Sequence, residues 1–321
     1  MTMSDLPQSR PQEIKIEPGQ EGQRIDNFLA SRLKGVPKTR IYRILRKGEV
    51  RVNKGRIRPS YRLQAGDTVR IPPIRTASRE TPVRPSDRVL ERIARSILYE
   101  NDRLLVIDKP SGIAVHGGSG LSYGVIEALR ALRPGAPFLE LVHRLDRETS
   151  GCLVVAKRRS SLRALHTLMR EGGVEKRYLA LVRGRWAGGA RRVDVPLRKN
   201  VLRSGERVVR VSPDGKAALS LFRPVSIYSQ ASLMEVQLLT GRTHQVRVHA
   251  AHVGHPIAGD TKYGDAAFNA AMGDLGLKRL FLHASAIGFT LPGAGEPVEV
   301  HAPLRPELRQ TLDRLESVYG E

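Results

Sequence analysis

The segment "HRLDRETSG" (residues 143–151) lies between the apolar stretches "FLELV" and "CLVVAK", whose composition is typical of buried strands. It places one acid, Asp146, between two arginines, Arg144 and Arg147. One interpretation is a surface turn in which opposite charges pair, because strongly perturbed acids are a minority among charged loop residues. The other is a catalytic carboxylate that nearby cations keep ionised while it acts on a negatively charged substrate. Features elsewhere in the chain distinguish the two.

The overall charge favours a polyanionic partner. The 321 residues include 54 Lys and Arg against 32 Asp and Glu, which gives a net charge of +22. Aromatic residues make up only 5% of the chain, so contacts with the backbone of a structured nucleic acid are favoured over extensive base stacking. A generally basic, solvated surface is the alternative.

The cysteine content and the hydropathy indicate a cytoplasmic protein outside the membrane. Cys152 is the single cysteine, so the chain can form neither an intrachain disulfide nor a thiolate metal cluster, which fits a reducing compartment. The first residues, "MTMSDLPQSRPQEIK", lack the apolar segment of a signal peptide. No apolar stretch approaches the roughly 20 residues that are needed to cross a bilayer.

Composition divides the chain into four parts. Residues 1–20 are polar and contain proline, which predicts a flexible tail. Residues 21–74 form a compact basic module, and residues 75–95 combine prolines and mixed charges in the manner of a linker that ends in a short helix. Residues 96–321 are long enough for a larger domain with its own core.

The basic module has the pattern of an RNA-binding unit. The segment "RIDNFLASRL" predicts one amphipathic helix, and "KTRIYRILRKGEV" predicts a second. Helical spacing on the second buries its aliphatic residues and leaves three cations on another face: Arg40, Arg43 and Lys47. Short strands follow in "VRVNKGRIR" and "LQAGDTVRIP". A purely structural module is the alternative, and the charge on one helical face argues against it.

From about residue 97 the pattern is that of an α+β domain. Stretches such as "RLLVIDKPSG" and "SLMEVQLLTG" predict strands, while "SYGVIEALRAL" and "PELRQTLDRLESVY" predict amphipathic helices. Strands outnumber helices and lack a regular βαβ rhythm, so we expect a mixed sheet.

Two further segments suggest ligand binding. "DKPSGIAVHGGSG" (108–120) is rich in glycine after a strand, but it does not match a phosphate-binding loop. "GRTHQVRVHAAHVGHP" (241–256) holds four of the nine histidines on a short helix that Thr243 is expected to cap. These histidines do not converge with an acid, so we predict no metal site. Arg242, just before this helix, is a candidate partner for an anion or a carboxylate.

The segment "KRYLALV" (176–182) predicts a strand that carries Tyr178. A tyrosine in such a strand is most often a core residue with a satisfied hydroxyl. The flanking cations Lys176 and Arg177 are unusual beside an apolar core and less so beside a nucleic-acid cleft.

Together, "HRLDRETSG", "KRYLALV", "GRTHQVRVH" and "RLFLHA" resemble the motifs of the RluA-type pseudouridine synthases, and residues 21–74 resemble the S-four-like RNA-binding domain that many of these enzymes carry. The resemblance covers nearly the whole chain, and "HRLDxxTSG" is highly specific. Departures are small: Val246 in the third segment, Cys152 after the first, and "KAALSLF" where the family is often more polar.

The resemblance implies a mainly antiparallel mixed sheet and an enzyme that isomerises uridines of 23S ribosomal RNA without metal or cofactor. The C1′–N1 bond breaks, the uracil turns, and a bond to C5 forms. The resemblance makes Asp146 the catalytic residue and Arg242 its cationic partner. It leaves open whether Asp146 attacks the sugar, attacks the base or removes the C2′ proton. We also expect a monomer.

The resemblance implies roles for other residues as well. Tyr178 packs on the uracil and accepts the C5 proton late in the reaction, while Leu282 forms an apolar wall of the base pocket. Arg144 fills the gap that the flipped uridine leaves in the RNA, and we expect the adjacent His143 at the RNA too.

Two competing functions remain at this point. A non-catalytic RNA-binding or ribosome-assembly protein explains the charge equally well, but binding alone does not need the carboxylate of Asp146. A nucleoside hydrolase or glycosidase needs paired carboxylates or a metal, and only Glu148 lies near Asp146 in the sequence.

Overall fold

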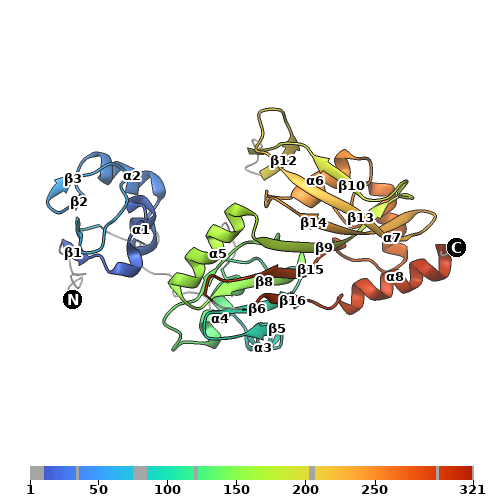
Figure 1. Cartoon of the computed structure of the whole chain (residues 1–321), viewed down its shortest axis with the longest axis horizontal. Helices are drawn as coiled ribbons and strands as arrows, with labels where there is room; N and C mark the ends of the chain where they lie inside the picture. The colour runs from blue at the N-terminus through green and yellow to red at the C-terminus, as the bar shows by residue number, and fades with distance from the viewer. Residues whose placement is uncertain are drawn as a thin grey trace, which may run out of the picture. The chain divides into compact units, whose positions relative to one another are not determined.

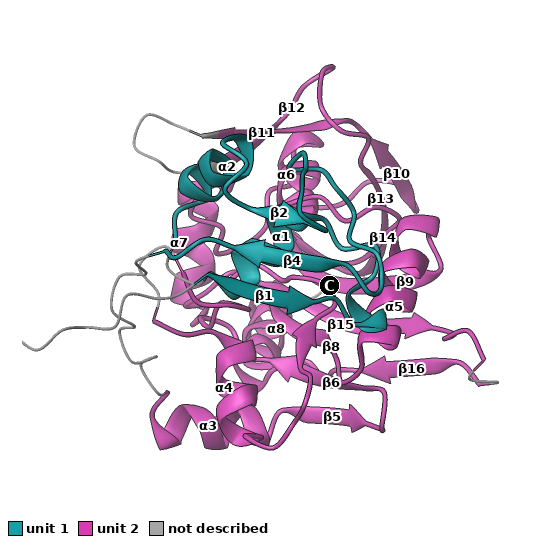
Figure 2. Ribbon diagram, turned by 90° about the vertical axis from the view of Figure 1, so that its left-hand side faces the viewer, with its two compact units in different colours: residues 1–83 teal, residues 84–321 magenta. Residues whose placement is uncertain are grey.

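The computed structural model describes residues 11–33, 36–74, 85–118, 122–201, 207–293 and 296–319. The chain divides into two compact units, residues 1–83 and residues 84–321 (Figure 2).

The first unit combines two helices with a small antiparallel sheet. Its elements are β1 (Gln12–Lys15), a 3-10 turn (Pro18–Gln20), α1 (Ile25–Arg32), α2 (Lys38–Arg46), β2 (Arg51–Val52), β3 (Gly55–Arg56) and β4 (Thr68–Ile71). The strands are ordered β1-β4-β2-β3, and the aliphatic residues of both helices are buried. As a result, α2 turns its predicted basic face outward, with Arg40, Arg43 and Lys47 exposed.

Two predicted boundaries of the chain differ from the structure. Residues 11–20 are ordered and not part of a flexible tail, because β1 pairs with β4, with Ile14 opposite Val69, and Ile16 is buried. Helix α3 (Asp87–Ala94) lies in the predicted linker, but its Leu90 and Ile93 belong to the core of the second unit. Residues 1–10 and 75–84 fall outside the described part of the chain.

The second unit is built on a ten-stranded sheet (Figure 1). Its strands are β5 (Ile97–Glu100), β6 (Leu104–Lys109), β7 (Glu140–Leu141), β8 (Ser150–Ala156), β9 (Val174–Arg183), β10 (Arg191–Asp194), β13 (Leu219–Ile227), β14 (Ala231–Leu238), β15 (Leu282–Phe289) and β16 (Val298–His301). A separate hairpin joins β11 (Leu197–Val201) and β12 (Arg207–Val211). The remaining helices are α4 (Val125–Leu132), α5 (Arg159–Glu171), α6 (Gln245–His252), α7 (Ala266–Asp274) and α8 (Pro306–Tyr319).

The order β10-β13-β14-β9-β15-β8-β6-β5 runs through the sheet, with β16 beside β15 and β7 beside β8. The β15–β8 pair is parallel, and the other pairs along this sheet are antiparallel. The prediction of a mixed, mainly antiparallel α+β fold is therefore confirmed.

Helices cover both faces of this sheet. Alternate residues of a strand point to opposite faces, so Leu105 and Ile107 of β6 pack with α3, α4 and α6, whereas Leu104 and Val106 pack with α5. Helices α7 and α8 pack against Leu181 of β9 and Leu233 of β14. The sheet is thus the middle layer of three.

The end of the "HRLDRETSG" segment lies where β8 meets β15. Gly151 has a φ of 108°, and a Cβ atom there would stand 2.2 Å from the backbone oxygen of Ala284. Only glycine permits this close approach. Cys152 follows inside the core, where burial raises the pKa of its thiol to about 12.

Candidate active site

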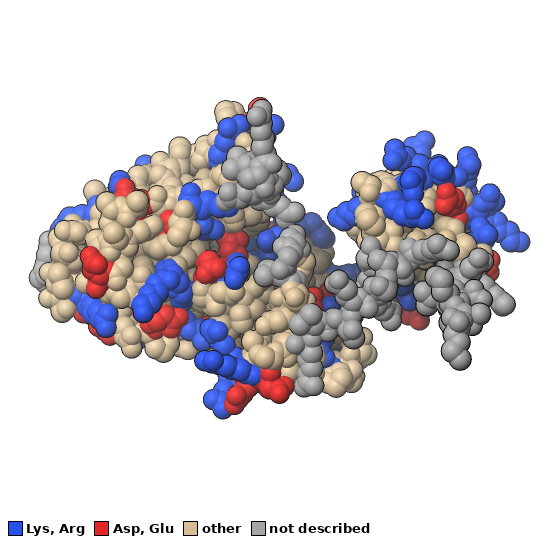
Figure 3. Space-filling model, turned by 180° about the vertical axis from the view of Figure 1, so that it is seen from behind, with Lys and Arg blue, Asp and Glu red and all other residues tan. Residues whose placement is uncertain are grey.

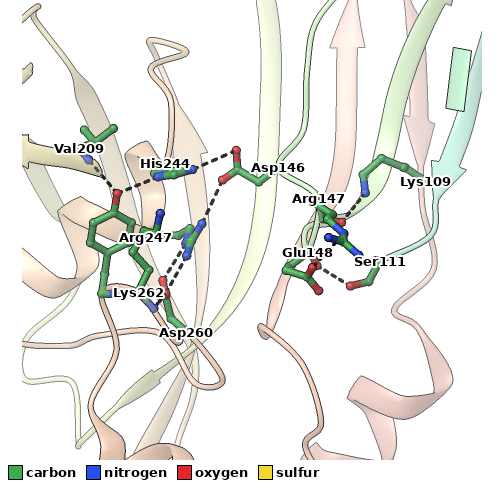
Figure 4. A network of polar contacts seen from close by, with 11 residues as sticks. Lys109, Ser111, Asp146, Arg147, Glu148, Val209, His244, Arg247, Asp260 and Lys262 are labelled. Carbon is green, nitrogen blue, oxygen red and sulfur yellow. Dashed lines mark hydrogen bonds and ion pairs between the residues drawn. The ribbon is translucent and has the colours of Figure 1, made fainter. Parts of the chain in front are cut away.

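Hydrogen bonds fasten the loop that carries Asp146 to a neighbouring turn (Figure 4). Lys109 at the end of β6 is fully buried, and its Nζ donates at 2.9–3.0 Å to the backbone oxygens of Pro110, Ile113 and Arg147. The Ser111 hydroxyl donates to the backbone oxygen of Glu148 at 2.7 Å. The backbone on the C-terminal side of Asp146 is therefore held in place by its surroundings.

Asp146 opens into a cavity of ≈ 60 Å³ formed by its loop, β9, β14, α6 and β15. The lining residues are Arg144, Leu145, Asp146, Thr149, Tyr178, Leu238, Arg242, His244, Gln245, Val246, Arg247 and Leu282. Among these described residues, Asp146 contributes the only carboxylate. A reaction that requires two carboxylates in one cavity is thus disfavoured here.

Two residues at the start of α6 face the carboxylate of Asp146. Nη1 of Arg247 lies 3.6 Å from Oδ2, and Nε2 of His244 lies 3.8 Å from Oδ1. His244 is the N-cap of α6 and Arg247 lies in its first turn, so both side chains come from the N-terminal end of the helix. Each carboxylate oxygen therefore has its own nitrogen partner.

The expectation that Arg242 pairs with Asp146 is not supported by the structure. Arg242 lines the rim of the cavity, but its Nε donates to the backbone oxygen of Ala217 at 2.9 Å. Thr243 does not cap α6; the N-cap is His244, so the helix begins one residue later than predicted. This helical phase directs Arg247 toward Asp146, while Arg242 stays in the preceding loop.

Arg247 is itself fixed by Asp260, which follows α6 in the chain. Both Nε and Nη2 of Arg247 donate to the Asp260 carboxylate at 2.7 Å, and the side chain of Asp260 is fully buried. The guanidinium also lies over the ring of Tyr263, 5.0 Å from its centroid. Sequence reasoning missed this pair. The available signal was that Asp260 is the first acid after Glu235 in a basic stretch.

The structure brings Tyr178 and Leu282 to the same cavity as Asp146. Leu282 stands opposite Ala180 on the neighbouring strand, and Tyr178 is two residues from Ala180, so both side chains lie on one face of the sheet. Burial raises the pKa of the Tyr178 hydroxyl, and the nearby Asp146 carboxylate adds to that shift. The phenol is consequently neutral at physiological pH.

The two residues before Asp146 differ in their surroundings. Arg144 is exposed at the rim of the cavity. His143 accepts a hydrogen bond at its Nε2 from the Val154 backbone N–H at 3.1 Å, and burial lowers its pKa to about 4. The ring of His143 therefore supports β8 as a neutral group.

Among the described residues, no group of three or more His, Cys, Asp and Glu side chains is arranged to hold a metal ion. Likewise, none of the helices in the described ranges is both long enough and apolar enough to span a membrane. Lys and Arg side chains gather on the surface of both units (Figure 3).

Known proteins resemble this chain in sequence. Residues 103–252 match the RNA pseudouridylate synthase family, and residues 23–69 match the S4 domain. A Salmonella typhi protein named ribosomal large subunit pseudouridine synthase C is 57% identical over 307 residues, which cover 95% of this chain and 96% of that protein. The protein of the same name from Escherichia coli (strain K12) is 57% identical over 305 residues, or 94% of this chain and 96% of that protein.

The fold is also found in solved structures. Human RNA Pseudouridylate Synthase Domain Containing 4 superposes with a TM-score of 0.59 at 29% identity, covering 71% of this chain and 95% of that chain. Human RNA Pseudouridylate Synthase Domain Containing 1 gives a TM-score of 0.55 at 28% identity, with coverage of 66% and 85%. With 57% identity running through both units to bacterial relatives, the chain belongs to the RNA pseudouridylate synthase family.

Proposed function

We propose that this protein isomerises uridines of 23S ribosomal RNA, in the large ribosomal subunit, to pseudouridine, with Asp146 as the catalytic residue. The observation that supports this most directly is the cavity in which Asp146, Tyr178 and Leu282 meet. The relatives named for the large ribosomal subunit support the choice of RNA. The net charge of +22 suits a polyanionic substrate of this kind.

In this proposal the target uridine leaves the RNA stack and enters the cavity. The uracil lies between Tyr178 and Leu282, and the Asp146 carboxylate acts on the nucleotide. The C1′–N1 bond breaks, the detached uracil turns and C1′ joins C5. The C5 proton is then lost to solvent, and N1 gains a proton from solvent. Atoms balance without any redox change. Because the Tyr178 phenol is neutral, we assign it to contact with the uracil ring and not to removal of that proton.

Arg247 orients the Asp146 carboxylate in this proposal. Its Nη1 lies 3.6 Å from Oδ2. The positive charge also reduces the repulsion between this carboxylate and the phosphates of a bound RNA. Arg247 thereby takes the role for which the sequence had suggested Arg242, and Arg242 at the rim becomes a candidate contact for the RNA backbone.

The remaining cations are assigned to RNA binding. We propose that Arg144 occupies the space that the flipped uridine vacates, since its side chain is exposed at the cavity rim. The exposed face of α2, with Arg40, Arg43 and Lys47, binds the RNA backbone and supplies affinity without chemistry. His143 contributes to this interface by fixing the backbone from which Arg144 projects.

We also propose a cytoplasmic monomer. The exposed large apolar side chains of the described residues are only four: Tyr42, Val225, Leu239 and Val318. The high net charge makes copies of the chain repel one another. The cytoplasm is where bacterial ribosomal RNA is made, and the single, buried cysteine suits its reducing conditions.

The Asp146→Asn variant tests the proposed function. The amide keeps the size of the side chain but can act neither as a nucleophile nor as a base, so we expect a folded protein that binds 23S RNA and forms no pseudouridine. The assay measures tritium release from C5-labelled uridine in 23S RNA lacking the modification. Glu148→Gln is the matched control, because Glu148 is an exposed acid of the same loop and should remain active. An active Asp146→Asn protein contradicts the catalytic assignment, and free uracil among the products indicates a hydrolase.

A further inference from the structure

His244 combines an unusual backbone conformation with two close neighbours. Figure 4 shows its ring beside the carboxylate of Asp146. It is the N-cap of α6 with a φ of 54°, in the left-handed region that a non-glycine residue keeps only where its surroundings hold it. Its Nδ1 lies 2.8 Å from the Tyr263 hydroxyl, and its Nε2 lies 3.8 Å from Oδ1 of Asp146. The ring thus connects Tyr263 with the catalytic carboxylate.

The hydrogen bonds of Tyr263 favour a proton on one particular nitrogen of His244. The backbone N–H of Val209 in β12 donates to the Tyr263 hydroxyl at 2.9 Å. The hydroxyl accepts there, and its own single hydrogen is free to point at Nδ1 of His244. A neutral imidazole that accepts at Nδ1 carries its proton on Nε2, which is the nitrogen facing Asp146.

The surroundings favour the neutral ring. Burial is the main cause that lowers the pKa of His244. The carboxylates of Asp146 and Asp260 oppose this shift. The positive charges of Arg247 and Lys262 add to it. A neutral N–H donor orients a carboxylate without adding a second positive charge. A further cation beside Asp146 would weaken it as a base or nucleophile.

We propose that His244 is a positioning residue: fixed as the Nε2–H tautomer by Tyr263, it donates a hydrogen bond to Oδ1 of Asp146 when RNA closes the site. Arg247 then holds Oδ2 from the same turn of α6. The present distance of 3.8 Å exceeds a hydrogen bond, and catalytic hydrogen bonds often shorten only in the substrate complex. This inference rests on the proposed function, because it concerns the carboxylate that is assigned to catalysis.

Two substitutions of His244 separate its contacts. His244→Asn suits the left-handed backbone and keeps a polar group near Tyr263, but it is too short to reach Asp146. His244→Gln places its amide N–H₂ where Nε2 stood. We expect kcat to fall about 10- to 100-fold in His244→Asn, with RNA affinity unchanged, and to recover largely in His244→Gln. His252→Asn, an exposed histidine at the other end of α6, is the control. Equal losses in the Asn and Gln variants would overturn the proposal.

The tautomer provides a readout that is independent of turnover. Long-range ¹H–¹⁵N NMR spectra of the full-length protein should show His244 protonated at Nε2 and unprotonated at Nδ1. Tyr263→Phe keeps the ring beneath Arg247 but removes the hydroxyl, so we expect a mixture of tautomers and a reduced kcat. A wild-type His244 protonated at Nδ1, or a Tyr263→Phe protein with unchanged tautomer and kcat, would refute the positioning role. An active Asp146→Asn protein would instead refute the proposed function.

Discussion

Replacing Asp260 with Asn tests the pair on which the position of Arg247 depends. The Asp260 carboxylate is fully buried and accepts two hydrogen bonds from the guanidinium, whose side chain is only 11% exposed. Removing one partner of a buried ion pair costs about 3–5 kcal/mol, because the other charge is left without compensation. Asparagine keeps an oxygen that can accept the N–H groups of Lys262 and Tyr263, now at 2.9 and 3.0 Å. We therefore expect a loss near the lower end, about 3 kcal/mol.

The assay is urea unfolding, monitored through tryptophan fluorescence. Trp186 is the only tryptophan of the chain and is buried in the second unit, so the signal reports the unfolding of the unit that contains Asp260. Asp274→Asn is the matched control, since that acid is exposed in the same unit and should change the free energy of unfolding by less than about 0.5 kcal/mol. If Asp260→Asn lowers the free energy of unfolding by no more than this control does, the argument from the buried ion pair is refuted.

The effect of Asp260→Asn on the free energy of unfolding should depend on pH. Burial raises the pKa of Asp260, but the hydrogen bonds and charge of Arg247 outweigh it, so the pKa lies below its ordinary value. A carboxyl with a lowered folded-state pKa stabilises the fold fully above its unfolded pKa of about 3.9, and loses this contribution as the pH falls through the folded value. The difference in free energy of unfolding between wild type and Asp260→Asn should thus be constant from pH 7 to about 5 and become smaller below about pH 4.

Three further predictions concern other contacts. Replacing Arg40, Arg43 and Lys47 together with Ala should weaken 23S RNA binding and lower the slope of log K against log salt by about 2–3, as measured by fluorescence anisotropy; an unchanged slope would place the RNA elsewhere. Lys109→Met should cost about 3 kcal/mol in urea unfolding, because backbone carbonyls lose their donor. Burial lowers the pKa of Lys109 to about 7, so the unfolded chain holds that proton more tightly than the folded protein does. The difference in free energy of unfolding between wild type and Lys109→Met should therefore grow from pH 7 towards about 10. A difference that does not change with pH would contradict this. Arg242→Ala should raise KM for the RNA with kcat nearly unchanged. A large loss of kcat would instead indicate that Arg242 acts on Asp146.

The sequence was sufficient for the parts of the site that lie on regular strands. Tyr178 and Leu282 were expected beside Asp146, and the alternation of β9 and β15 does place them in one cavity. Arg242 was expected to pair with Asp146 from its place just before the helix and from the family motif, but the structure places Arg247 there. Arg247 lies in the first turn of α6, whereas Arg242 lies in the loop before it, and the left-handed His244 that precedes the helix has no local sequence signal.

Long-range pairs explain the other differences. A loop separates Arg247 from Asp260 in the sequence, so no periodic pattern predicts that they pair. Residues 11–20 look like a tail by composition, yet the partner that orders β1 is β4, more than fifty residues away in the chain. Pairing of this kind depends on the assembled sheet and not on local propensity.

The burial of Cys152 makes this protein well suited to spectroscopy. Its thiol lies in the core and has a pKa of about 12, so it should not react with maleimide dyes at neutral pH. Native residues then need no replacement before labelling. Cysteines introduced at exposed serines, such as Ser60 in the first unit and Ser160 in the second, would take a donor and an acceptor fluorophore. Energy transfer between them would test whether the distance between the two units changes when ribosomal RNA is added.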